Sequence, residues 1–166
     1  MRVFSGGLYC FASLVLFAFC AYSQKLSMNE RCVSDYKAAY DNYMSGNYSS
    51  SLEGFSDFLS RYPQKDNPFS EQAFFYRAAA SHALTNADAD VLLSDFIRQY
   101  PQSVYLNKAS FLLADFYSNA GKFERALEVY KGMNVSALEG ESWYEYHYKY
   151  GHWLFLNSDY DEAVSE

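Results

Sequence analysis

Side chains that could perform chemistry are few in this sequence of 166 residues, and their spacing suits neither a metal site nor a catalytic centre. The three histidines are His82, His147 and His152. The last two stand five residues apart, which places them on different faces of a helix. The sequence contains no glycine-rich phosphate loop and no Gly-x-Ser-x-Gly nucleophile elbow. We therefore predict that the chain is not an enzyme and has no catalytic residues, no bound metal and no cofactor.

Acidic residues gather at two places, around Asp88 and Asp90 and again from Asp159 to Glu162. Both places are expected helix starts, where carboxylates complement the helix dipole, and we favour this role over calcium binding. Without Arg2, which lies in the apolar N-terminal segment, 12 basic side chains stand against 20 acidic ones, a net charge of −8. Phosphate backbones require Lys and Arg clusters, so nucleic acid is not an expected partner.

The first 23 residues have the pattern of a secretory signal peptide. Arg2 is their only charge, residues 8–19 are apolar or small, and Ala21 and Ser23 suit a cleavage site before Gln24. The apolar run is short for a membrane span, which needs about 20 residues. Two alternatives are an uncleaved signal anchor and a lipid attached at Cys20. Cleavage would leave Cys32 as the one cysteine, expected to be a buried small hydrophobe near the start of the first helix.

The elements behind these side chains are indicated by a repeat. Residues 55–64 read FSDFLSRYPQ and residues 93–102 read LSDFIRQYPQ, with S-D-F and Y-P-Q in common. Phe55, Phe58 and Leu59 fall on one stripe of a helix, and Pro63 should end that helix at Tyr62. Such internal similarity is typical of helical-repeat architectures.

The clearest unit resembles the tetratricopeptide repeat. That repeat places an apolar and a small residue side by side, then an aromatic, a turn glycine, an aromatic, an alanine and a last aromatic. Here these residues are Leu113, Ala114, Tyr117, Gly121, Phe123, Ala126 and Tyr130. The resemblance implies an all-α fold, an α-solenoid of antiparallel helix pairs that winds as a right-handed superhelix.

The same frame covers residues 24–166 as one repeat domain after a signal peptide at 1–23. The small residue recurs at Ser51, Ala89, Ala126 and Ala163, 37 or 38 residues apart. The expected units are residues 30–66, 69–104, 107–138 and 141–166. The last is incomplete, so we expect the chain to be the N-terminal piece of a longer protein.

Two stretches fit the frame less simply. In unit two, Leu84 and Asn86 stand where a glycine and an aromatic are expected, so we predict that this turn is built differently. In unit four, tyrosines alternate with polar residues from Tyr144 to Tyr150, which is a strand signal. The repeat frame favours a helix there.

In this family the first helix of each pair lines a concave groove. The resemblance therefore implies a groove that binds a protein or peptide partner, since tyrosines bring contact area and a polar tip at low entropy cost. The groove residues we predict are Tyr36, Tyr40, Tyr43, Phe74, Ala78, Ser81, Phe111, Asp115, Ser118, Tyr148, His152 and Phe155.

The leading functional hypothesis is an exported scaffold for protein–protein interaction in a bacterial cell envelope. The Tyr-Pro ending after Phe-x-x-Phe-Leu resembles envelope members of the family, such as the lipoprotein of the outer-membrane β-barrel assembly machine and the periplasmic coordinator of the Tol–Pal system. This resemblance implies a periplasmic or outer-membrane-associated location. One alternative is a glycan-binding component of an outer-membrane uptake system, with Trp143 and Trp153 stacking on sugars. Another is a module of a larger enzyme whose active domain lies beyond Glu166.

Overall fold

The computed structural model describes residues 29–62 and 67–165, so the signal peptide and Cys20 lie outside the described residues. Within these residues there are only helices and turns, as the resemblance implies, and the tyrosine-rich stretch of unit four is helical. The helices are residues 29–44, α2 (Tyr48–Arg61), α3 (Ser70–Ala83), α4 (Ala89–Gln99), α5 (Leu106–Asn119), α6 (Phe123–Lys131), the short 3₁₀ helix η2 (Val135–Ala137), α7 (Glu141–Leu156) and α8 (Tyr160–Ser165).

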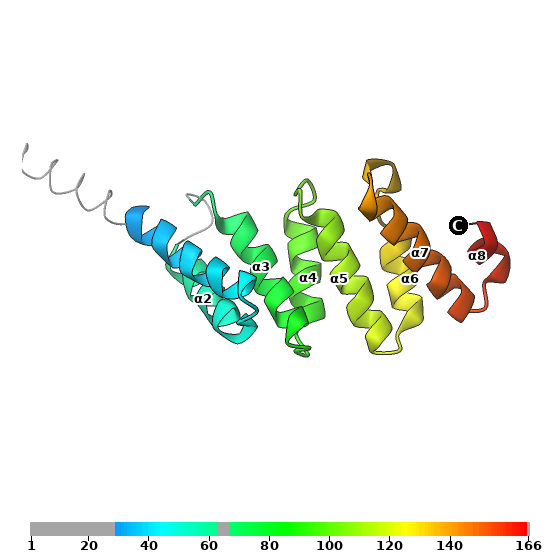
Figure 1. The fold of residues 1–166 in the computed structure, drawn as a ribbon, viewed down its shortest axis with the longest axis horizontal. Coiled ribbons are helices and arrows are strands. Elements are labelled where there is room, and N and C mark those ends of the chain that lie inside the picture. The colour runs from blue at the N-terminus through cyan, green and yellow to red at the C-terminus, as the bar shows by residue number, and fades with distance from the viewer. Residues whose placement is uncertain (1–28, 63–66, 166) are drawn as a thin grey trace, which may run out of the picture.

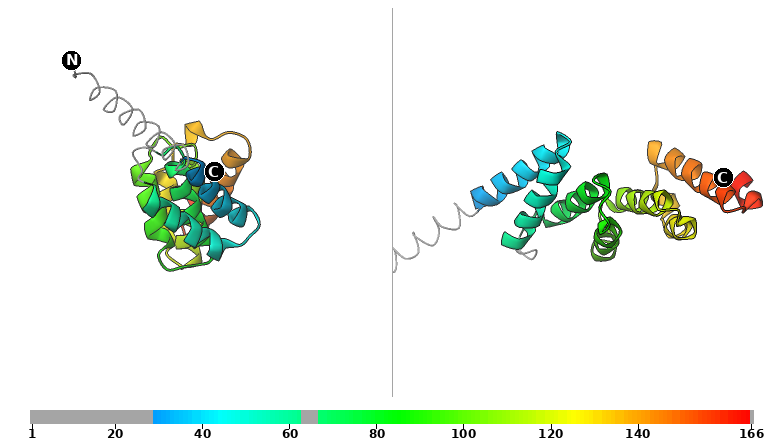
Figure 2. Two further views of the ribbon diagram at one scale, coloured as in Figure 1. Left: turned by 90° about the vertical axis from the view of Figure 1, so that its left-hand side faces the viewer. Right: turned by 90° about the horizontal axis from the view of Figure 1, so that it is seen from below.

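The helices stand side by side in chain order and form an elongated row (Figure 1). Each one packs mainly on the helix before it and the helix after it, and α3 also touches α5. Figure 2 shows the same row from the end and from below, where successive pairs are turned against one another. None of the described helices is both long and apolar enough to cross a membrane. The architecture is an α-solenoid of antiparallel helix pairs.

All four units turn between their two helices in the same way. Gly46, Thr85, Gly121 and Ser158 take positive φ angles of 77°, 55°, 71° and 70°. In each turn the amide of this residue donates to the carbonyl three residues back, and the next amide donates to the carbonyl five residues back, at 2.8–3.1 Å. Two such bonds close the end of a helix around a left-handed residue, and glycine takes this conformation most easily.

The prediction that the turn of unit two is built differently is confirmed for its length, whereas its left-handed conformation is shared with the other units. Its left-handed residue is Thr85, one position after Leu84, and the repeat frame places the glycine at Leu84. The difference lies after the turn: α4 begins at Ala89, four residues after Thr85, whereas α6 begins two residues after Gly121. The aromatic that starts the second helix in units one and three is missing in unit two, and the helix starts later.

Small residues occupy the places where the paired helices approach each other, as the repeat frame predicts. Ser51, Ala89 and Ala126 are fully buried, and Ala163 is half-buried against the last core cluster. Aromatic and aliphatic side chains fill the space between units in two clusters. The first joins units one and two through Phe55, Phe58, Phe75, Leu93 and Phe96. The second joins units three and four through Phe111, Leu127, Tyr130, Tyr146, Tyr150 and Leu154. Cys32 is buried in the first cluster, and burial raises the pKa of its thiol.

Candidate functional site

The residues predicted to line a groove occupy three equivalent positions in the first helix of each pair. One position is Tyr36, Phe74, Phe111 and Tyr148. A second is Tyr40, Ala78, Asp115 and His152. The third is Tyr43, Ser81, Ser118 and Phe155. Equivalent positions of a repeat point in the same direction within each unit. Any difference in their exposure among the four units therefore comes from what packs against them.

In unit one, all three positions contact the first helix of unit two. The ring of Tyr36 stacks on Phe69 with 4.6 Å between centroids, and its hydroxyl donates to Oε1 of Gln72 at 2.6 Å. Tyr40 and Tyr43 both meet the edge of Tyr76, at 5.0 and 4.9 Å. Burial raises the pKa of Tyr36 to about 12. These tyrosines are half-buried and join two units.

In unit two the same positions are also occupied by packing. Ala78 and Ser81 are fully buried, and the Ser81 hydroxyl donates to Oδ1 of Asp88 at 2.7 Å. Phe74 is half-buried between the Arg77 guanidinium, 4.9 Å from its ring centre, and the ring of Tyr100. None of these three residues offers a broad exposed surface.

In unit three, α7 contacts the first two positions, Phe111 and Asp115, and the third, Ser118, is buried. Lys149 on α7 donates to both carboxylate oxygens of Asp115, at 2.9 and 3.1 Å, and its amine lies 5.8 Å from the ring centre of Phe111. Phe111 and Ser118 are each 6 % exposed. Burial alone would lower the pKa of the Lys149 amine, but its hydrogen bonds to Glu145 and Asp115 outweigh that effect and raise it. The charged pair thus secures unit four on unit three.

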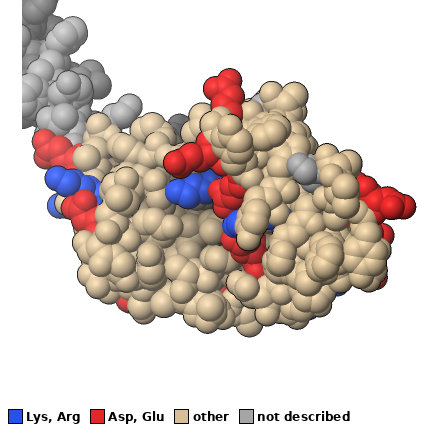
Figure 3. All heavy atoms as spheres, turned by 45° about the vertical axis from the view of Figure 1, so that its right-hand side comes forward, with Lys and Arg blue, Asp and Glu red and all other residues tan. Residues whose placement is uncertain are grey.

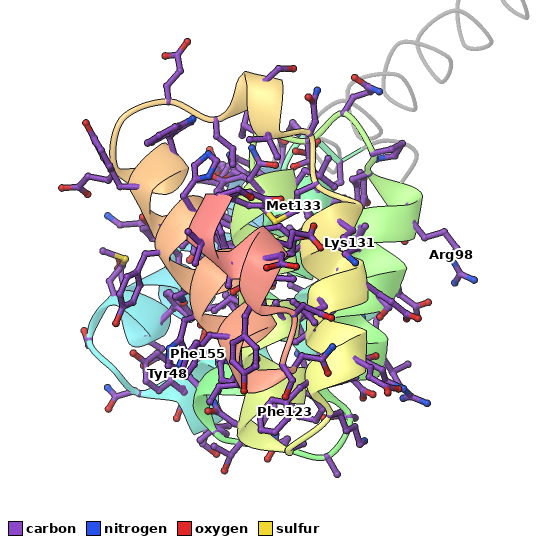
Figure 4. All side chains as sticks on the ribbon, turned by 90° about the vertical axis from the view of Figure 1, so that its right-hand side faces the viewer. Tyr48, Arg98, Phe123, Lys131, Met133 and Phe155 are labelled. Carbon is purple, nitrogen blue, oxygen red and sulfur yellow. The ribbon has the colours of Figure 1, made fainter. Side chains whose placement is uncertain are left out.

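Unit four is different, because its three positions are open. Tyr148 is 75 % exposed and Phe155 58 %, and His152 is exposed as well. Trp143 and Tyr144 extend the same surface. We call these five side chains, Trp143, Tyr144, Tyr148, His152 and Phe155, the α7 face. Figure 4 looks onto this end of the molecule and labels Phe155, whose ring packs on Tyr160 of α8.

An open hollow of about 480 Å³ lies on the α7 face. Its lining consists of Trp143, Tyr144, His147, Tyr148, Gly151, His152 and Ala163. The rings of Tyr148 and His152 are parallel, with centroids 6.3 Å apart. Two of the lining residues, Gly151 and Ala163, are small. This hollow can accept an apolar or aromatic group between polar ring edges.

Comparison with solved structures identifies the architecture. Two crystal structures of nearly identical TPR-like repeats, from a Podosopora anserina protein described as a kinesin light chain, superpose on this chain. One, of a point variant, has a TM-score of 0.64 at 17 % identity and covers 81 % of this chain and 70 % of the other. The second has a TM-score of 0.63 at 17 % identity, covering 81 % and 71 %. The fold is a TPR-like α-solenoid. No protein-family model and no curated protein matches the sequence.

In this TPR-like solenoid, the residues predicted to line one groove do not form one open surface. Eight of the eleven non-alanine positions belong to units one to three and are buried or half-buried in contacts between or within units. The three of unit four are exposed together.

Four residues that line the hollow were not predicted from the sequence, namely Tyr144, His147, Gly151 and Ala163. For Tyr144 a signal existed: it stands four residues before Tyr148 and eight before His152, which places all three on one helix face.

The two tryptophans proposed for sugar stacking lie in different environments. Trp143 is 42 % exposed and lines the hollow. Trp153 is half-buried and stacks on Phe123 of α6, with centroids 5.3 Å apart, so it belongs to the joint between units three and four. In residues 29–62 and 67–165 no group of three or more His, Cys, Asp or Glu side chains is placed to hold a metal ion.

Proposed function

We propose that this chain is a non-catalytic scaffold that binds a protein segment on the α7 face and works in a bacterial cell envelope. The observation that carries the proposal is the exposure of Trp143, Tyr144 and Tyr148 around one hollow. Contiguous exposed aromatic surface is unusual on soluble proteins and marks interaction sites. Tyrosine and tryptophan are also the side chains most enriched where binding energy is concentrated.

The location of the partner site follows from the repeat. The predicted groove positions of units one to three already make contacts inside the solenoid, such as Tyr36 with Phe69 and Asp115 with Lys149. Two of the equivalent positions of unit four, Tyr148 and His152, line an open hollow instead. We therefore assign binding to the α7 face and leave the other positions a structural role.

A pull-down tests the binding function. The purified chain is used as bait in an envelope extract, beside a Tyr144→Ala, Tyr148→Ala double variant and a Val104→Ala control. Val104 is 88 % exposed and lies between α4 and α5, away from the α7 face. We expect a protein partner with the unaltered chain and the control, and its loss with the double variant. Equal recovery by all three baits, or by none, contradicts the proposal.

Export rests on the sequence of residues 1–23, whose short apolar run is followed by small residues. Expression with this segment in place, followed by fractionation and N-terminal mass analysis, tests it. We expect an envelope fraction that begins at Gln24. A product in the cytosolic fraction that keeps Met1 argues against envelope work and leaves the binding proposal unaffected.

A second candidate function is glycan capture, because Trp143 lies exposed beside Tyr144 and Tyr148. Aromatic faces stack on the apolar faces of sugar rings. Titration of tryptophan fluorescence with a glycan panel separates the two functions, since only Trp143 of the two tryptophans lines the hollow. A saturable shift that disappears in Trp143→Phe would favour the glycan; no shift with any glycan leaves the protein partner ahead.

A further inference from the structure

The partner itself can be described by its chemistry, on the basis of the proposed function. We propose that the α7 face binds a basic, amphipathic α-helix of a partner protein, seated as the first helix of each unit is seated on the unit before it. The solenoid would then use the same kind of contact for a second molecule that it uses to join its own units.

The internal joints show what such a helix must present. On unit one, α3 and its N-cap bring Phe69, Gln72 and Tyr76 against Tyr36, Tyr40 and Tyr43. These three incoming residues are three or four apart, so they form one stripe of a helix. On unit three, α7 brings Tyr146, Lys149, Tyr150 and Trp153 against α5 and α6, again on one stripe. An incoming helix therefore carries aromatic rings at helical spacing with a polar group between them.

The charge around the α7 face selects a basic partner. Residues 139–165 contain Glu139, Glu141, Glu145, Asp159, Asp161 and Glu162. The one Lys or Arg among them is Lys149, which is paired with Asp115 and Glu145. Figure 3 shows acidic side chains at the right-hand edge and, beside basic ones, near the middle of a surface that is otherwise mostly uncharged. A cationic helix gains attraction from the excess of carboxylates, and an acidic one is repelled.

A second copy of the chain, stacked head to tail, is a poor match. The positions of unit one that correspond to Tyr146, Lys149, Tyr150 and Trp153 are Ser34, Lys37, Ala38 and Asp41, all of them exposed. They bring no ring to the hollow. The described part of the molecule thus has one polar end and one aromatic end, and only the aromatic end resembles a joint.

Two synthetic helices test the proposal on the purified chain. The neutral probe copies residues 69–84, the segment that covers unit one, and a staple between positions 74 and 78 holds it helical on the side away from its contacts. The basic probe adds Glu71→Lys and Ser81→Lys. Binding is read from Trp143 fluorescence, because the probes contain no tryptophan and Trp153 packs on the opposite side of α7 against Phe123. Amide chemical shifts then show which helices respond.

We expect the basic probe to bind more tightly than the neutral one and to weaken as salt is added. Shifts should concentrate in α7 and α8. Tyr148→Ala should reduce affinity about tenfold or more, as truncation of a central interface aromatic does, whereas Val104→Ala should leave it unchanged. Tyr148 is 75 % exposed, so its removal does not threaten the fold, and a thermal melt checks this.

Three results would overturn the inference. The first is no binding of either probe up to about 1 mM, the weakest affinity that counts as specific here. The second is equal, salt-independent binding of both probes, which removes the basic partner. The third is a dimer in sedimentation that Tyr148→Ala abolishes, because a second copy would then occupy the face. A partner recovered by pull-down and lost in the Tyr148 variant, while both probes fail, would refute the helix and preserve the proposed function.

Discussion

At the residue scale, the hydroxyl of Ser51 stands where units two and three have alanine. Ser51 is fully buried, and among the described residues its hydroxyl oxygen has no hydrogen-bond partner. A buried hydroxyl without a partner costs about 1–3 kcal/mol. We predict that Ser51→Ala raises the free energy of unfolding by about 1 kcal/mol in a denaturant titration.

Ser118→Ala provides the matched control for this substitution. Ser118 is also buried, but its hydroxyl donates to the Ala114 carbonyl at 2.8 Å, so its loss should leave stability unchanged or lower it by up to about 1 kcal/mol. Equal destabilisation by both substitutions would mean that the Ser51 hydroxyl is satisfied in solution.

Thr85 is a second residue in an unfavourable state, because it is β-branched and yet has a φ of 55°. The left-handed region costs a residue with a Cβ roughly 1–2 kcal/mol, and glycine avoids this cost but loses more chain entropy on folding. We predict that Thr85→Gly stabilises the protein by about 0.5–1 kcal/mol, after allowance for the lost bond from its hydroxyl to the Leu84 carbonyl.

The reverse change at the equivalent turn checks the explanation. Gly121 has a φ of 71°, and a Cβ there would meet no atom within 4 Å, so Gly121→Ala tests conformation alone. It should destabilise by about 1 kcal/mol. Thermal denaturation measures the change in Tm of both variants. Changes of the same sign in Thr85→Gly and Gly121→Ala would contradict the explanation by backbone conformation.

At the scale of elements, His82 at the end of α3 links stability to pH. Burial lowers the pKa of its imidazole below the ordinary 6.5; the Asp115 carboxylate on α5 opposes this, and the Lys149 amine on α7 adds to it. The unfolded chain therefore binds this proton more readily than the folded one. By linkage, the free energy of unfolding should fall as pH decreases through 6.5 toward the folded-state pKa.

His82→Gln isolates this contribution, because glutamine does not titrate. The slope of stability against pH below 6.5 should become shallower in the variant. Chemical denaturation at a series of pH values measures it. An unchanged slope would assign the acid sensitivity to other groups.

At the scale of the whole molecule, the repeat explains which features the sequence could predict. The helices, the buried Ala126 and the left-handed turns at Gly46 and Gly121 follow from spacing within one unit, which the sequence displays directly. The left-handed conformation of Thr85 was not predicted, because threonine can hold it without the glycine that signals it.

The candidate site depends on relations between units, and these are less visible in a sequence. The rotation of one helix pair against the next decides whether a position such as Tyr40 is open or covered, and no local pattern encodes it. Equivalent spacing grouped Tyr148 with Tyr36 correctly as a repeat position. The exposure of Tyr148, against the half-burial of Tyr36, required the arrangement in space.

Because each helix contacts mainly its neighbours, local stability should vary along the row. Eight residues of α3 are buried, and it packs on α2, α4, α5 and the helix of residues 29–44, whereas α8 has no buried residue. We predict that native-state hydrogen exchange is fastest in α8, slower in α7, and slowest in α3 to α5. Mass spectrometry of peptic fragments measures this order. The basic probe should slow exchange in α7 and α8, where a bound helix would add contacts, and leave α3 unchanged. Uniform exchange along the chain would show instead that the described units unfold as one cooperative body.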